Sequence, residues 1–317
     1  MEKTIFDKIR HYNKNATDTS LKSYSSNIVL VAKALGVNKD DISPSVFKNL
    51  NTVYKALESQ SLNTIKNKLV AVYMYLQACG YNKDVIEQYN DKIYMLLGKV
   101  RNQTAKMEWS DKEKDKLITM DDLMLILSRM RDELSKDLDT FKSIEKMMRY
   151  LCLKVYASYP MRNDMADMKI YTDSEFNNIK EDNDINYMVI NPKNMGCKII
   201  LNNFKTKKEG VVSFPIEDDD LVKMILNYYI ACKKFYEYND HQYEHWFLWK
   251  RDYIKMSRNV LTKFLISIFE NEIGKKISTT MLRKITTSSL IDTAKFKKMA
   301  YIQGHSVNTA LSSYAKF

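Results

Sequence analysis

Apolar residues in the first hundred positions recur at the three- and four-residue spacing of amphipathic helices. Gly36 and Gly80 follow two of these stripes, at positions where glycine can end a helix. The predicted helices cover 21–35, 44–57, 65–79 and 83–97. Together they predict one compact helical unit over residues 1–100.

Residues 101–118 are strongly polar and show no apolar periodicity, which predicts a charged linker. A second helical run opens at Thr119, where Asp122 three residues later is typical of a capping box. Further apolar stripes predict helices up to Pro160 and again after position 221. A second domain is therefore expected over residues 119–317.

A short alternating pattern interrupts the helices of this second domain and predicts a small three-stranded antiparallel sheet. The strands are expected at 187–190, 198–204 and 211–215. Three lysines crowd the loop between the last two strands, an arrangement that favours solvent or a polyanion nearby. These are Lys205, Lys207 and Lys208. The predicted fold class is mainly α with this one small sheet.

Composition supports a helical, basic protein. With 7 Gly and 4 Pro in 317 residues, a loop-rich all-β protein is disfavoured. The net charge of +11 is typical of polyanion binders, although many basic proteins bind no polyanion. Lys66 and Lys68 lie off the apolar stripe of the third helix, where they could meet phosphates or simply face solvent.

The four cysteines have no C-x-x-C spacing, so we expect free thiols in a reducing compartment. A polar beginning and the lack of a long apolar run predict an intracellular protein without a membrane span, in the cytoplasm or in a eukaryotic nucleus. His241 and His245 are four residues apart but have no third ligand at a motif spacing, so no metal site is predicted.

Candidate chemistry lies in the last 38 residues. Arg283 follows a leucine, His305 comes 22 residues later after a glycine, and Tyr314 follows nine residues after His305. A tyrosine hydroxyl can attack a phosphorus atom if fixed cations neutralise the charge that builds on the phosphoryl oxygens. Arg162, which precedes the predicted sheet, could supply a second such cation, or it could be a surface arginine paired with Asp164 or Asp167.

The order of these residues resembles the C-terminal box of the tyrosine recombinases (the phage integrase family), which reads His-x-Leu-Arg, then Gly-His, then Tyr. The resemblance implies a C-shaped clamp around DNA: a helical (SAM-like) core-binding domain, a linker and a catalytic domain. It covers nearly the whole chain. Two departures stand out: Thr280 occupies the histidine position of the family box, and three residues follow Tyr314, where many relatives have a further helix.

Carried over residue by residue, the resemblance makes Arg162 and Arg283 the two catalytic arginines and Tyr314 the nucleophile. His305 takes the late His/Trp position. The sheet-loop lysine that would act as general acid falls on Lys205, with Lys207 as the competing choice. Thr280 can donate a hydrogen bond but cannot act as a base near neutral pH.

The resemblance further implies DNA cleavage and rejoining through a 3′-phosphotyrosyl bond, without a metal ion or nucleotide cofactor. Its partners would be double-stranded DNA and further copies of the chain, as a tetramer on DNA. The expected DNA contacts are Lys66, Lys68, Lys208 and Lys284. The Asn-, Lys- and Tyr-rich composition is typical of AT-rich viruses and mobile elements. Two alternatives remain: a type IB topoisomerase, and a sequence-specific DNA-binding protein that has lost catalysis.

Overall fold

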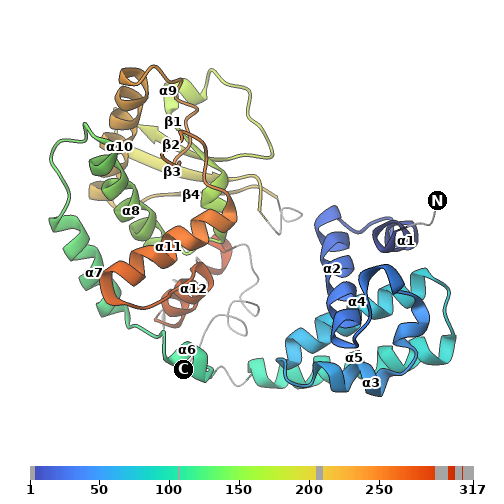
Figure 1. Ribbon diagram of the computed structural model, residues 1–317. Coiled ribbons are helices and arrows are strands. Elements are labelled where there is room, and N and C mark those ends of the chain that lie inside the picture. Colours follow the sequence, from blue (N-terminus) through green and yellow to red (C-terminus); the bar gives the residue numbers. More distant parts are fainter. Residues whose placement is uncertain (1–3, 106–107, 205–209, 290–298, 304–308, 310–317) are drawn as a thin grey trace. The chain divides into compact units, whose positions relative to one another are not determined.

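The computed structural model describes residues 4–105, 108–204, 210–289, 299–303 and 309. The chain divides into two compact units, residues 1–106 and 107–317, drawn in Figure 1. Each unit has a hydrophobic core of its own. The packing of each unit can therefore be understood from its own side chains.

The described residues of the first unit form helices and no strand. The helices are α1 (Ile5–Tyr12), α2 (Asp18–Ala34), α3 (Leu50–Leu57), α4 (Leu62–Ala78) and α5 (Lys83–Ala105), with the 3₁₀ turns η1 (Lys39–Asp41) and η2 (Pro44–Phe47). Helix α4 contacts α1, α2 and α5, because it buries side chains on more than one face. Gly36 (φ 77°) and Gly80 (φ 59°) adopt left-handed conformations just after α2 and α4, as their positions in the sequence predicted.

Three details of this unit differ from the sequence expectation. Helix α1 was not predicted, because it is short and a single buried side chain, Ile9, anchors it. The helix expected at 44–57 is broken after η2, since the Asn49 side chain accepts a hydrogen bond from the backbone of Thr52 (3.1 Å) and starts α3 afresh. Helix α5 continues to Ala105, into the stretch predicted as a linker.

The second unit contains helices on both sides of a small sheet. The helices are α6 (Asp111–Lys114), α7 (Met120–Asp132), α8 (Phe141–Ser158), α9 (Asp173–Phe176), α10 (Asp219–Tyr238), α11 (Arg258–Ile273) and α12 (Thr279–Ser288), with the 3₁₀ turn η3 (Asn163–Asp167). The predicted capping box of α7 is present: Thr119 and Asp122 exchange hydrogen bonds at 2.8 and 3.0 Å.

The sheet is mixed and has four strands, so the prediction of three antiparallel strands was wrong. Its strands are β1 (Met168–Thr172), β2 (Asn186–Asn191), β3 (Gly196–Leu201) and β4 (Val212–Pro215), in that order across the sheet. The last three are antiparallel as expected, whereas β1 pairs in parallel with β2. The strand β1 was not predicted, and it directly follows the 3₁₀ turn η3.

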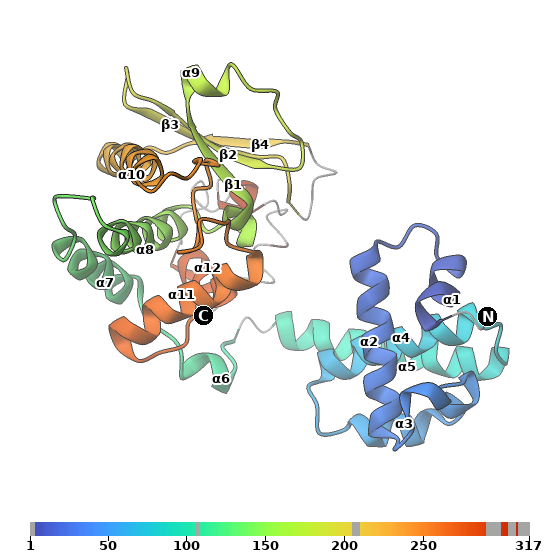
Figure 2. The same cartoon turned by 45° about the horizontal axis from the view of Figure 1, so that its top comes forward.

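Alternating side chains of the strands serve two cores, with α8 and α10 on one face of the sheet and α9 on the other (Figure 2). Ile170, Met188 and Ile199 point into the main core, while Tyr171, Tyr187 and Ile200 pack with Phe176 of α9. The sheet is thus buried on both faces, which explains why its strands read as apolar runs.

The cysteines differ in their surroundings. Cys152, Cys197 and Cys232 are buried in the second unit, and Cys79 at the end of α4 is half-buried. Burial raises the pKa of each thiol, for Cys197 and Cys232 to about 12. Across the described residues, no helix combines the length and the apolar composition needed to cross a bilayer.

Candidate active site

Arg162 stands at the start of η3, four residues after the end of α8. Helix α8 ends at Ser158, because Pro160 cannot continue it. The hydroxyl of Tyr156, buried in the last turns of α8, donates a hydrogen bond to the carbonyl of Arg162 (2.8 Å). The backbone from which the arginine projects is therefore held against the core.

Asp164, two residues further on, is almost fully buried at 3% exposure. Arg258 at the start of α11 places a guanidinium nitrogen 3.5 Å from its carboxylate. The same arginine is 2.7 Å from the carboxylate of Asp167, to which Lys255 also binds at 3.3 Å. Arg258 and Lys255 thus bind the carboxylates of the turn that carries Arg162.

Arg283 projects from α12 and is only 7% exposed. Ser278 caps the helix by accepting a hydrogen bond from the backbone of Met281 (3.3 Å). Thr280, in the first turn, is exposed and lies one turn before Arg283 on the same side of the helix. A threonine hydroxyl near the arginine is thus available to solvent or ligand.

Arg162 and Arg283 lie far apart in the sequence, but η3 and α12 both pack against α11. Burial raises the pKa of Asp164, while the charges of Arg258, Arg162 and Arg283 act on it in the opposite direction. Burial likewise holds the pKa of Tyr156 well above its ordinary value, against the charges of Arg283 and Arg258. Arg162 and Arg283 therefore belong to one electropositive cluster.

The start of the sheet loop is anchored beside this cluster. The buried amide of Asn186 accepts hydrogen bonds from the backbone of Asn202 (2.9 Å) and Asn203 (2.8 Å), and donates to the carbonyl of Asp164 (2.9 Å). Arg258 donates to the carbonyl of Asn203 (3.2 Å). The predicted loop lysines that follow, Lys205, Lys207 and Lys208, lie outside the described residues.

Gln303, two residues before the predicted histidine His305, contacts α12. Gln303, only 2% exposed, donates a hydrogen bond from its side-chain amide to the hydroxyl of Thr287 (3.0 Å). Thr287 is one turn after Arg283 on the same side of α12. His305 and Tyr314 themselves lie outside the described residues.

The described lysines expected to bind DNA have different surroundings. Lys66 and Lys68 are half-buried on α4, and Lys66 donates to the side chain of Asn63 (2.9 Å). Lys284 forms an ion pair with Glu113 of α6. Burial favours a higher pKa for Glu113, but hydrogen bonds from Lys284 and from Ser110 outweigh it and lower the pKa to about 2.

Sequence reasoning missed Arg258 and Asn186. The partners of Arg258 are 91 positions away at Asp167 and 55 at Asn203, and no motif marks it. Asn186 precedes an apolar strand, and nothing in its local sequence indicates that its amide joins two distant segments. Both residues became recognisable only once the three-dimensional arrangement was known.

The two spaced histidines lie in aromatic surroundings. His245 stacks on Tyr171, with ring centroids 4.2 Å apart, and His241 stacks on Tyr253 at 3.9 Å. Burial lowers the pKa of His245. In the described part of the chain, no group of three or more His, Cys, Asp or Glu side chains is placed to hold a metal ion.

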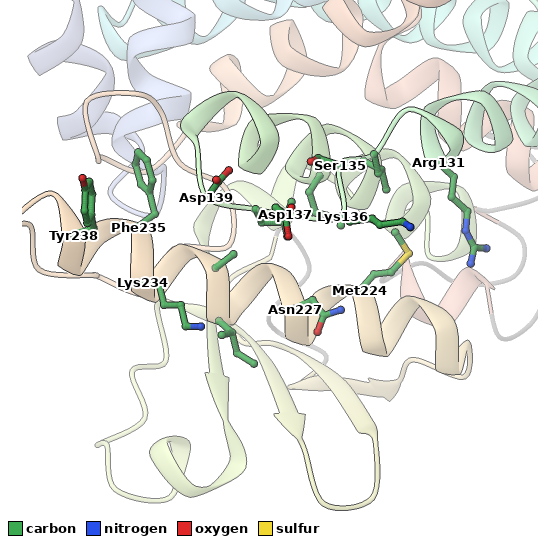
Figure 3. A pocket seen from close by; sticks show the side chains of 15 residues that line it. Arg131, Ser135, Lys136, Asp137, Asp139, Met224, Asn227, Lys234, Phe235 and Tyr238 are labelled. Carbon is green, nitrogen blue, oxygen red and sulfur yellow. The ribbon is translucent and has the colours of Figure 1, made fainter.

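A surface cleft of about 1050 Å³ lies apart from the arginine cluster, between α10 and the segment that follows α7 (Figure 3). Met224 and Phe235 contribute apolar walls, and Arg131 and Asp139 contribute opposite charges. The cleft contains no residue that the sequence predicted to be functional. It is therefore a feature separate from the candidate active site.

No protein-family model matches this chain, and no curated protein matches it. Among solved structures, the crystal structure of XerA recombinase is similar over 99% of this chain and 94% of that one, at 11% sequence identity and a TM-score of 0.40. That likeness is distant. Function is therefore inferred from the side chains themselves.

Proposed function

We propose that this chain is a tyrosine recombinase that cuts and rejoins DNA by transesterification, with Arg162 and Arg283 as the clamp for the scissile phosphate. One observation carries the proposal: Arg162 begins η3, the buried Arg283 lies on α12, and both elements pack against α11. Guanidinium groups are planar donors that match phosphate oxygens in pairs. A cluster of this kind suits a phosphodiester whose charge grows during the reaction.

In the proposed reaction, the Tyr314 hydroxyl attacks the scissile phosphorus and forms a 3′-phosphotyrosyl bond. The bond from phosphorus to the 5′ oxygen breaks, and Lys205 gives that oxygen a proton. His305 hydrogen-bonds the phosphate or assists the loss of the tyrosine proton. The energy of the phosphodiester is conserved in the new bond, so a 5′ hydroxyl of a partner strand can reverse the step and reseal the DNA.

Two contacts of described residues support the proposed roles of Lys205 and His305. Asn203, two residues before Lys205, is bound by both Asn186 and Arg258 next to Asp164. Gln303, two residues before His305, is bound to the helix that carries Arg283. These anchors hold the described residues that come just before both groups in the sequence, which supports the proposal.

A covalent-capture experiment tests the proposal on DNA of every sequence at once. Purified protein is mixed with randomised DNA duplexes that each carry one nick, so that a cleaved strand cannot be rejoined. DNA that stays bound to protein in detergent is then recovered and sequenced. We expect the wild type to give covalent complexes at a defined sequence, and Tyr314→Phe to bind the same DNA without forming any.

Covalent complexes formed equally by Tyr314→Phe would show that another residue is the nucleophile. Tight binding without any covalent complex from the wild type would overturn the proposal in favour of a DNA-binding protein without catalysis. Supercoiled plasmid, incubated in parallel, separates the remaining alternative. Relaxation without joining of two sites would identify a type IB topoisomerase.

A further inference from the structure

Arg258 lies between the two segments that border the phosphate clamp, and no part of the proposed reaction uses it. We propose that Arg258 is a positioning residue that balances the carboxylates of Asp164 and Asp167, so that Arg162 and Arg283 keep their charge for the scissile phosphate. This inference rests on the proposed function and adds a residue to it.

The contacts of Arg258 join three elements. Its Nε lies 2.7 Å from Asp167 Oδ2 and its Nη2 lies 3.5 Å from Asp164 Oδ1, both in η3. The same Nη2 donates to the carbonyl of Asn203 (3.2 Å), which follows β3. One guanidinium therefore fixes the turn that carries Arg162 to the end of a strand.

The backbone of Arg258 is fixed as well. Its carbonyl accepts hydrogen bonds from the Asn163 side chain (3.1 Å) and from the Thr262 hydroxyl (3.2 Å), and Asn163 also donates to that hydroxyl (2.8 Å). Asn163 is the immediate neighbour of Arg162. The first turn of α11 and the start of η3 are thus bound to each other at both side-chain and backbone level.

The charges of the groups around Asp164 and Asp167 indicate what these contacts do. Arg258 and Lys255 set two positive charges against the two carboxylates of Asp164 and Asp167. The two carboxylates are therefore balanced when Arg258 is present, and without it one negative charge is left over in the turn that carries Arg162. Negative charge develops on the non-bridging oxygens in the transition state of phosphodiester transfer.

Because the two carboxylates are poorly exposed, a negative charge left unbalanced there is costly. The side chain of Asp164 is 4% exposed and that of Asp167 is 19% exposed, so water screens their charges poorly. A buried carboxylate that loses its partner turns to the nearest cation or takes up a proton. Asp167 keeps Lys255, but the other cations that act on Asp164 are Arg162 and Arg283, whose charge the phosphate needs.

The test uses full-length protein on the captured target sequence and measures the rate of covalent complex formation together with DNA affinity. Arg258→Ala is expected to slow cleavage by roughly 10- to 100-fold at unchanged affinity, since it weakens a charge clamp rather than removing it. Arg258→Lys should recover part of the rate. Adding Asp167→Asn to Arg258→Ala should recover part of it too, because one surplus carboxylate is then gone.

A second substrate separates an electrostatic role from a structural one. A methylphosphonate at the scissile position has lost one charged oxygen and so demands less positive charge. The defect of Arg258→Ala should shrink on this substrate relative to the ordinary phosphodiester. Lys263→Ala, an exposed site on the same helix, is the matched control and should behave as wild type on both.

Wild-type rates for Arg258→Ala would overturn the inference alone. So would a defect of equal size on both substrates that Asp167→Asn does not relieve, since that pattern describes a purely structural residue. A wild type that forms no covalent complex on either substrate would overturn the proposed function and this inference with it. Thermal melts of each variant show whether a loss of rate comes from unfolding.

Discussion

The two units of the chain hold their positive charge in different ways. Residues 1–106 contain 16 Lys and Arg against 9 Asp and Glu, a net charge of +7 in one third of the chain. Residues 107–317 contain 34 against 30, a net of +4. Among the described residues of the first unit, one ion pair is found, between Arg10 and Asp18. In the described part of the second unit, ion pairs are frequent and some are partly buried.

This difference teaches that one chain can use cations for two purposes. Charge that is spread over exposed lysines attracts a polyanion over many weak contacts and gives affinity that depends on salt. Charge that is buried and balanced by carboxylates is fixed in place, and can act on one phosphate. Substitutions in the first unit should therefore change DNA affinity, and those in the arginine cluster should change rate.

The largest expected effect is that of Arg283→Ala, which tests the second half of this comparison. Loss of one fixed donor to a transition state typically costs about 10²–10³-fold in rate, or roughly 3–4 kcal/mol. DNA affinity should stay at the wild-type value. The rate of covalent complex formation at saturating DNA measures the first quantity, and fluorescence anisotropy of labelled DNA measures the second.

Because Arg283 is buried, Arg283→Lys serves as a second variant that keeps charge and most of the volume. It should fold as the wild type and still cleave slowly, since an ammonium cannot bind two oxygens in a plane. Arg129→Ala, at an exposed arginine of α7, is the control and should be neutral. A parallel loss of affinity and rate in Arg283→Lys would contradict the separation of the two purposes.

An intermediate effect is expected from the ion pair of Glu113 and Lys284. The pKa of Glu113 is lowered to about 2 from its ordinary 4.5, so the pair stabilises the folded state above pH 4.5 and this contribution is lost as the pH falls towards 2. Allowing for partial exposure, we expect Glu113→Gln to cost about 1–2 kcal/mol at pH 7. The difference from wild type should shrink between pH 4.5 and 2.

Tryptophan fluorescence during urea unfolding measures this effect in the second unit alone, since Trp109, Trp246 and Trp249 all belong to it. The matched change in the first unit is Glu87→Gln, at an exposed carboxylate of α5, and it should leave the transition unchanged at every pH. A cost for Glu113→Gln that is the same at pH 7 and pH 2.5 would mean that the pair is not what stabilises this region.

The smallest effect is expected on α4, from Lys66→Ala and Lys68→Ala. Each substitution should weaken binding to any duplex alike and reduce the salt dependence of affinity by about one unit of slope. Cleavage at saturating DNA should be unchanged. Binding titrations over a range of salt concentrations measure this, with Lys223→Ala on α10 as an exposed control. A change in sequence preference would show that these lysines contact bases.

The sequence was a good guide where structure depends on nearby residues. The stripes ending at Gly36 and Gly80 are helices, and the capping box at Thr119 is present. It was a poor guide to β1, since pairing in parallel with β2 is decided by a strand 18 positions further on. The same holds for the break before α3, where one asparagine cap prevails over an apolar stripe.

The same distinction between local and distant contacts applies to the residues of the candidate site. Arg162 and Arg283 could be singled out because each sits in a short local pattern, whereas Asn186 and Arg258 matter only through partners brought together by folding. Lys205, Lys207, Lys208, His305 and Tyr314 stay predictions. The assignment of Lys284 to DNA also stays a prediction, and it competes with an ion pair that its sequence position did not reveal.

The uneven burial of the cysteines has a practical consequence for the study of this protein. Thiolates, not thiols, react with maleimides; the pKa of all four thiols is raised, and the three of the second unit are in addition buried. Cys79 alone among the four reaches the surface, at the end of α4. The natural chain thus offers one attachment point for a fluorophore, placed in the unit with the larger excess of positive charge and remote in sequence from every residue assigned to chemistry.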